Sequence, residues 1–236
     1  DMLERQSVRQ TMLATKGFAY SINDAYINGD QAVIADQFEG LNKIVSNLSS
    51  AQTVGASEID ISSTATDTTN MLAVERMMDA HTFVEGSKPD AAFCNISFAR
   101  QFRKIVLREK LLGTTHDWVA NTFESTDPRV TERTSSTTPA FVFDNVPYYI
   151  IGKKYDQSTE IIGNAYAEGG SSAATRIFLV KFGPEDLEGI QAGPLDVVDI
   201  GILESKDNLR KRLKWTLGLA CWGPRSVVKV AGIKVA

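Results

Sequence analysis

Two histidines are the side chains best suited to proton transfer or metal binding near neutral pH, and they lie far apart in the chain. His81 falls inside an expected helix, and His116 falls in a long polar segment. No second histidine stands at metal-ligand spacing, and neither His-Glu-x-x-His nor Gly-x-Ser-x-Gly occurs in the sequence. We therefore interpret both histidines as packed or solvated, and we predict no catalytic residue, no metal site and no cofactor.

Two further polar groupings carry little chemical signal. The run Gly169-Gly170-Ser171-Ser172 has the composition of a phosphate loop but lacks the Gly-Lys-Ser/Thr sequence that follows in one, so we expect a hairpin tip. Glu185, Asp186 and Glu188 lie close together, but they lack the alternating ligands of a calcium loop. We interpret these three residues as a solvated turn.

The densest group of charges is basic and lies near the C-terminus. Its members are Lys206, Arg210, Lys211, Arg212 and Lys214. As a functional surface, Lys206, Arg210, Arg212 and Lys214 would face acidic groups of a neighbouring subunit or the phosphates of DNA. A solvated strand face is the simpler interpretation, and we favour it.

The composition is that of a globular chain able to bury a sizeable core, with 236 residues, 43% hydrophobic and 23% charged. A net charge of -4 argues against a surface that binds nucleic acid throughout. Cys94 and Cys221 lie in apolar runs, so we expect buried, reduced thiols that suit a reducing cytoplasm. We find neither a membrane span nor a secretion signal. The chain starts at Asp1 inside a helix pattern, which suggests that upstream residues were cleaved or are absent.

A long helix from Met2 to Tyr26 is the clearest element. Its apolar stripe recurs at alternating spacings of four and three residues. The stripe consists of Val8, Met12, Thr15, Ala19, Ile22 and Tyr26. We expect Asn28-Gly29 to end this helix in the left-handed conformation.

Shorter elements follow. Residues 33–44 contain a Gly-centred turn that is too short to be an element of its own. We expect helices over about 70–84, capped by Thr66, Asp67 or Thr68, and over 97–109, capped by Ser97. Strands are expected over 91–96, 141–143, 148–151, 175–182, 195–203 and 226–230, and a long loop over 111–139. The clearest strand runs from Leu209 to Cys221, with apolar residues at odd positions facing a core and basic residues at even positions.

Three stretches, in this order, carry a family resemblance. They are the long helix ending in Asn28-Gly29-Asp30 with Phe38-Glu39-Gly40-Leu41-Asn42-Lys43 after it, Pro89-Asp90-Ala91-Ala92-Phe93 with the helix that follows, and Leu213 to Ala220 continuing through Pro224 to Ile233. Together they resemble the spine helix with its Gly-Leu turn, the start of the axial-domain core, and the final strand pair of tailed-bacteriophage major capsid proteins with the Hong Kong 97-like fold. The order and spacing of the stretches carry this resemblance.

The resemblance implies an α+β fold with a long spine helix, peripheral β-strands and a mixed α/β axial domain. Residues 1–46 and 191–218 would form the peripheral domain, 47–190 the axial domain, and 219–236 a return to the axial domain. The helix stripe would pack on the strand that carries Leu213, Trp215 and Leu217.

The resemblance also implies a structural protein and not an enzyme. The major head protein of a phage self-assembles in the host cytoplasm into the hexamers and pentamers of an icosahedral capsid, which encloses double-stranded DNA in the virion. The implied partners are further copies of the chain, portal and scaffold or minor capsid proteins, and DNA bound non-specifically, with no membrane. Two alternatives stay open: an encapsulin-like nanocompartment shell protein, and an α/β enzyme that uses the Ser/Thr-rich loops.

Two departures from the family are visible in this chain. The N-terminal arm and the extended E-loop normally precede the spine helix, but this sequence begins at the helix. Some members join subunits by an isopeptide bond between an E-loop lysine and a neighbour's asparagine, assisted by a glutamate. The corresponding stretch here has Asp207, Asn208 and Lys214, with no glutamate after Glu204. We therefore predict no autocatalytic cross-link.

Overall fold

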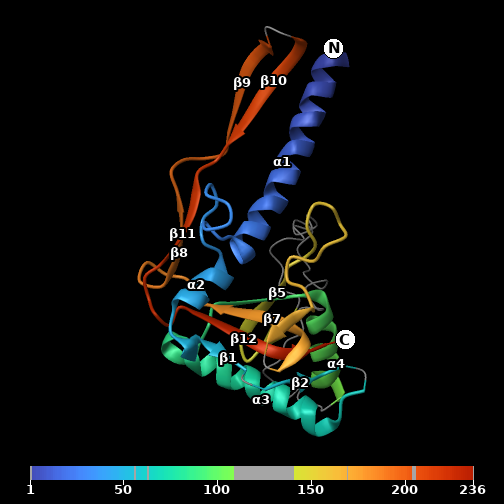
Figure 1. Cartoon of the computed structure of the whole chain (residues 1–236), viewed down its shortest axis with the longest axis vertical. Helices are drawn as coiled ribbons and strands as arrows, with labels where there is room; N and C mark the ends of the chain where they lie inside the picture. The colour runs from blue at the N-terminus through green and yellow to red at the C-terminus, as the bar shows by residue number, and fades with distance from the viewer. Residues whose placement is uncertain are drawn as a thin grey trace, which may run out of the picture.

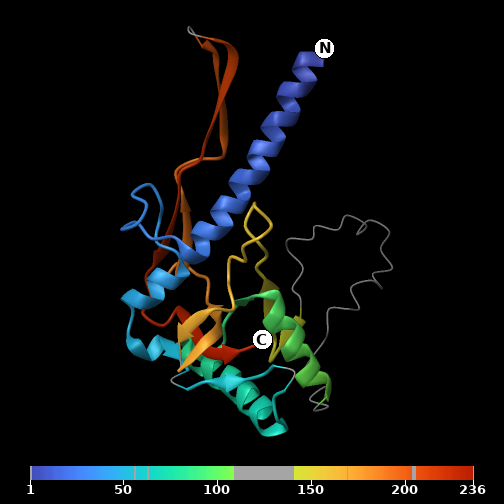
Figure 2. The same cartoon turned by 45° about the vertical axis from the view of Figure 1, so that its right-hand side comes forward.

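The computed structural model of the chain describes residues 2–55, 57–62, 64–108, 141–168, 170–203 and 206–235. A body of sheet and helices carries a long helix and a β-hairpin, which extend from the body in the same direction (Figures 1 and 2). The mixed α and β architecture expected from the sequence is confirmed. The expected loop over 111–139 and His116 lie outside the described residues.

The long helix α1 spans Met2–Asn28, as the apolar periodicity predicts. Its described side chains are half-buried or exposed, except for the buried Ala25 and Ile27 near its end. A second helix, α2, spans Leu41–Asn47, where we expected only a turn. Burial of Leu41 in the core explains the difference, because packing stabilises a helix that is too short to form alone.

A mixed sheet forms the centre of the body, in the order β1-β12-β7-β3-β5-β4. The strands are β1 Thr53–Val54, β12 Val227–Lys234, β7 Ser171–Val180, β3 Ala91–Cys94, β5 Val146–Ile150 and β4 Phe141–Phe143, with β2 Ile59–Asp60 beside β12 and β6 Tyr166–Glu168 beside β7. Strand β12 is antiparallel to β7 and parallel to β1, while β3 is parallel to β5. Glu168 at the end of β6 pairs with Ser171 at the start of β7, which confirms the expected hairpin tip.

Two hydrophobic cores cover opposite faces of this sheet, because alternate residues of β7 contribute to each. Ile177 and Leu179 belong to the core beneath α3 (Asp67–Phe83) and α4 (Ile96–Arg108). Phe178 belongs to the other core, which also contains Ile27 and Leu41 from the end of α1 and from α2. The sheet is therefore the platform from which α1 projects.

Two short ladders continue away from the body, in which β8 (Leu187–Gln191) pairs with β11 (Leu217–Cys221) and β9 (Asp196–Leu203) with β10 (Lys206–Lys214). The expectation of one strand from Leu209 to Cys221 is wrong. Pro194 separates β8 from β9, and proline cannot donate to a ladder, so the opposite strand breaks at the same level. Trp215 and Thr216 lie at this break.

Smaller differences concern helix starts and ends. Thr66, one of the three expected candidates, caps α3. Helix α4 is capped by Asn95 and not by Ser97, because the Phe98 backbone N–H donates a hydrogen bond to Asn95 Oδ1. Short 3-10 helices occur at Ser50–Gln52 and Glu85–Ser87.

Within the described ranges, no helix combines the length and apolar character needed to cross a membrane. The division of the chain into two domains stays a prediction.

Candidate assembly surface

The angle at which α1 leaves the body is set by a contact between two glycines. Gly40 donates its backbone N–H to the carbonyl of Gly29 at 2.9 Å. A Cβ at Gly29 would lie 2.4 Å from the Phe38 and Ala25 carbonyl oxygens, and a Cβ at Gly40 would lie 2.6 Å from Ala25 O and Gly29 N. Neither glycine has a positive φ. The expectation of a left-handed Gly29 is therefore wrong, because this position needs glycine for close backbone approach.

Polar contacts hold the same end of the helix. The Asn28 amide donates to the Ile161 carbonyl at 2.9 Å and to Asp24, and Asp24 pairs with Lys154 at 2.8 Å. The Tyr26 ring meets Phe93 edge-on, with centroids 5.6 Å apart. These contacts lie within the last turns of α1, so the helix is anchored at its C-terminal end.

The rest of the predicted stripe faces outward in the single chain. Val8 and Met12 are 48% and 62% exposed, Ala19 is exposed, and Thr15 and Ile22 are half-buried. Leu13 and Tyr20 add further exposed apolar surface. A contiguous apolar surface of this kind is characteristic of a protein–protein contact.

The packing expected between the stripe and the later strand is largely absent within the described chain. Leu213, Trp215 and Leu217 are half-buried, not part of a core. Trp215 contacts α1 through Phe18, a residue outside the stripe, with ring centroids 6.5 Å apart. The Trp215 Nε1 atom is buried without a hydrogen-bond partner among the described residues. The stripe at Val8 and Met12 therefore has no partner surface, within the described part of the chain, that explains its apolar character.

The hairpin β9–β10 presents further exposed apolar side chains, on both of its sides, that our sequence reasoning missed. Val197, Val198 and Ile200 are all exposed on β9. The sequence predicted an apolar strand here. It did not predict that the apolar residues would be exposed, because periodicity does not tell whether the same chain or a second molecule covers them. A lone two-stranded hairpin is marginally stable in water, so these residues indicate a contact with another chain.

The predicted basic residues lie on β10. Arg210, Arg212 and Lys214 are exposed, as is Lys211, and the backbone of Lys206 pairs with β9. Lys214 stands opposite Asp196, and Lys211 stands opposite Asp199. Opposite charges in register reduce the positive potential of the strand. Arg210 and Arg212 stand opposite uncharged residues and keep the strongest attraction for an anion.

His81 is packed inside the body. Its Nδ1 lies 3.3 Å from Asp144 Oδ2, and its Nε2 lies 3.1 Å from the Tyr148 hydroxyl. Burial lowers the pKa of His81, and Asp144 opposes this shift only in part. The residue links α3 to the β4–β5 hairpin, in agreement with our interpretation of a packed histidine.

Two half-buried carboxylates, Glu168 and Asp186, are paired with basic side chains within the chain. Glu168 accepts two hydrogen bonds from Arg176, at 3.0 and 2.9 Å, and one from Lys229 at 3.1 Å. Burial raises the pKa of Glu168, but these hydrogen bonds outweigh burial and hold it below its ordinary value. Asp186 pairs with Lys181 and accepts from Ser226, which accounts for part of the acidic turn.

The sulfur and acidic residues form no metal centre within the described residues. Cys94 is buried and Cys221 is half-buried, and both are free thiols. Burial raises the pKa of each thiol. The buried state expected for Cys94 is confirmed, and Cys221 is less buried than expected.

Comparison with known proteins supports the fold. No protein-family model and no curated protein matches the sequence. Among solved structures, the chain is similar to the shell protein in the holo-SrpI encapsulin complex from Synechococcus elongatus, with a TM-score of 0.57 and 13% sequence identity. The match covers 98% of this chain and 66% of the encapsulin chain, so this chain spans just under two thirds of that protein. The chain therefore has the Hong Kong 97-like fold.

Proposed function

We propose that this chain is a subunit of a closed icosahedral protein shell, formed by self-assembly into hexamers and pentamers. One observation carries this proposal: α1 is anchored at one end, while Val8, Met12 and Leu13 are exposed along the part that projects from the body. In a fold shared with an encapsulin shell protein, a second copy is the partner that this surface fits best. The role is structural and not catalytic.

In a closed shell, each contact between two subunits can be weak. Symmetric assembly repeats each contact many times, and every subunit is held by several neighbours at once. The exposed apolar residues of α1 and those of β9 lie on two separate elements that project from one body. A subunit with two or more weak contacts of this kind favours an extended, closed assembly over a simple dimer.

For the contents of the shell, we propose double-stranded DNA inside a phage head, in a virion assembled in the host cytoplasm. Further copies of the chain, portal and scaffold or minor capsid proteins would be its partners. The resemblance of three ordered stretches of sequence to tailed-phage major capsid proteins supports this choice. An encapsulin-like compartment filled with protein cargo is the second candidate, and the similarity to an encapsulin shell protein favours it.

Electron microscopy and particle analysis test both levels of the proposal. We expect negative-stain images of the expressed protein to show uniform closed particles or capsomers. After nuclease treatment, protected double-stranded DNA would support the phage head, whereas particles with protein cargo and no DNA would support the compartment. A strict monomer at high protein concentration would contradict the shell itself.

A further inference from the structure

Helix α4 carries an outer face of positive charge that shell assembly does not explain. Its thirteen residues include four basic side chains and no acidic one. Arg100 and Lys104 are exposed, and neither has an ion-pair partner among the described residues. By contrast, Lys154 and Lys229 each pair with a carboxylate. The charges of Arg100 and Lys104 are therefore available to another molecule.

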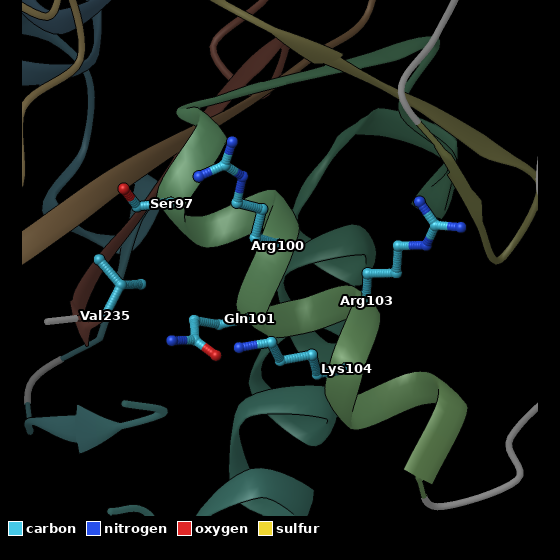
Figure 3. A pocket seen from close by; sticks show the side chains of 6 residues that line it. All are labelled: Ser97, Arg100, Gln101, Arg103, Lys104 and Val235. Atoms are coloured by element: carbon cyan, nitrogen blue, oxygen red, sulfur yellow. The ribbon is translucent and has the colours of Figure 1, made fainter. Parts of the chain in front are cut away.

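Two adjoining hollows lie beside this face, and we call them together the α4 groove. The larger has a volume of about 520 Å³ and is lined by Ser97, Arg100, Gln101, Arg103, Lys104 and Val235 (Figure 3). The smaller, of about 250 Å³, shares Gln101 and Lys104 and extends to Ile61 and Asn70. In Figure 3, Gln101 and Lys104 point to the side of α4 where Val235 lies, whereas Arg103 points away.

Asn70 gives the groove its chemical specificity. It lines the smaller hollow and is 4% exposed, yet its side-chain amide makes no hydrogen bond within the described part of the chain. Because this amide lines the hollow, its donors and its acceptor are available to a molecule that enters there. A ligand that offers both a donor and an acceptor would satisfy it.

We propose that the α4 groove binds an extended peptide that carries acidic side chains. Arg100 and Lys104 provide charge for carboxylates. The amides of Asn70 and Gln101 each have donors and an acceptor, which match the C=O and N–H groups of a peptide backbone. Ile61 and the end of β12 at Val235 add apolar surface for the rest of the ligand side chains.

The same residues disfavour nucleic acid as the occupant. A phosphodiester backbone offers acceptors alone, so it would leave the amide oxygens of Asn70 and Gln101 without donors. A duplex is a broad convex rod, whereas Asn70 lines a hollow of about 250 Å³. Among the described residues that line the groove there is no aromatic ring, and stacking on aromatic rings is what holds single strands.

Peptide binding is measured on the unassembled subunit, so the outcome is independent of shell formation. The probes are a fluorescently labelled peptide of alternating Glu and Ala, a matched peptide of Gln and Ala, and short duplex DNA. We expect the Glu peptide to bind about tenfold more tightly than the Gln peptide, with an affinity that falls as salt is added. Absence of binding by the Glu peptide, or tighter binding by the duplex, would overturn the proposal.

Three variants locate the binding site. Asn70→Leu keeps the branched shape of the side chain, with its larger methyl groups beside an open hollow, and breaks no side-chain hydrogen bond described in the chain. It should therefore weaken binding about tenfold without lowering the melting temperature. Lys104→Glu should weaken binding by a similar factor, about tenfold, because an attractive charge becomes repulsive. Lys211→Glu makes the same charge change on β10 and should leave the affinity within about twofold. Equal effects of the two Lys variants, or no effect of Asn70→Leu and Lys104→Glu, would refute the α4 groove as the site.

Discussion

Gly29 and Gly40 contact each other through their backbones, and this contact leaves no space for a side chain at either position. The obstacles are backbone atoms of Ala25 and Phe38, which cannot rotate aside as a flexible side chain can. Because these atoms belong to α1 and to the segment before α2, a substitution here strains two elements at once.

Replacing Gly40 with alanine should destabilise the subunit by about 1–3 kcal/mol, the range for overpacking a well-packed site. Urea denaturation of the unassembled subunit measures this loss as a lower midpoint. Gly189→Ala is the matched control, because no atom lies within 4 Å of the position that its new methyl group would occupy and its φ is not positive. Equal midpoints for the two variants would contradict the backbone contact.

His81 predicts a dependence of stability on pH. Since burial lowers its pKa in the folded chain, the folded state binds the proton less readily than the unfolded state. Its contribution is complete above the ordinary histidine pKa of about 6.5 and is lost as pH falls below that value. We expect His81→Gln to show a smaller fall in urea midpoint between about pH 7.5 and pH 5.5 than the parent chain.

Comparing how the urea midpoint of each protein changes with pH separates His81 from the carboxylates that do not contact it, because those carboxylates contribute equally to both proteins. Asp144 pairs with His81, so its effect belongs to the same difference. His81→Gln keeps an amide able to bond to Tyr148, so a general loss of packing is minimised. Parallel curves for the parent and the variant would show that His81 does not control this pH dependence.

At the scale of elements, the sequence predicted those helices and strands that have a clear local pattern. It missed those features that depend on packing between distant parts of the chain. The periodicity of α1 and the apolar run over 195–203 were sufficient to find both elements. Helix α2 was missed because its stability depends on burial of Leu41 and Val45, which no local pattern reveals. The break at Trp215 was missed because its cause, Pro194, lies on a different strand.

The candidate surface was predictable only in part for a related reason. Periodicity locates an apolar stripe on α1, but it does not distinguish a stripe covered by the same chain from one covered by a second copy. The exposure of Met12 makes that distinction. The α4 groove was missed because its residues come from separate elements, with Asn70 on α3 and Val235 beyond β12.

Substitution of Met12 by aspartate should block assembly without unfolding the subunit. Met12 is 62% exposed, so we expect a change in unfolding free energy of at most about 0.5 kcal/mol. A buried, unpaired charge at a subunit contact would, however, abolish particles seen by light scattering and electron microscopy. Gln10→Asp places the same charge on an exposed position outside the stripe and should still assemble. Normal particles from Met12→Asp would remove the stripe from the assembly surface.

At the scale of the whole molecule, two cores on opposite faces of one sheet form a rigid platform, and two elements project from it. This arrangement separates folding from association, because the cores lie in the body while exposed apolar side chains lie on α1 and β9. Stability measurements and assembly measurements should therefore respond to different sets of substitutions.

We expect the assembled shell to be held by non-covalent contacts. The stretch around Asp207, Asn208 and Lys214 has no glutamate after Glu204 to assist an isopeptide bond. Assembled particles boiled in detergent should thus run on a gel as a single band at the 25.8 kDa monomer mass. A ladder of covalent oligomers that survives boiling would refute this prediction.

The glycine contact at the base of α1 also determines geometry far from itself. A helix of 27 residues is about 40 Å long, so a change of about 10° at its base displaces its free end by about 7 Å. In a closed particle, that displacement changes the tilt between neighbouring subunits and hence the curvature of the wall. Gly29 and Gly40 would then govern particle diameter, while the exposed residues of α1 govern whether particles form at all.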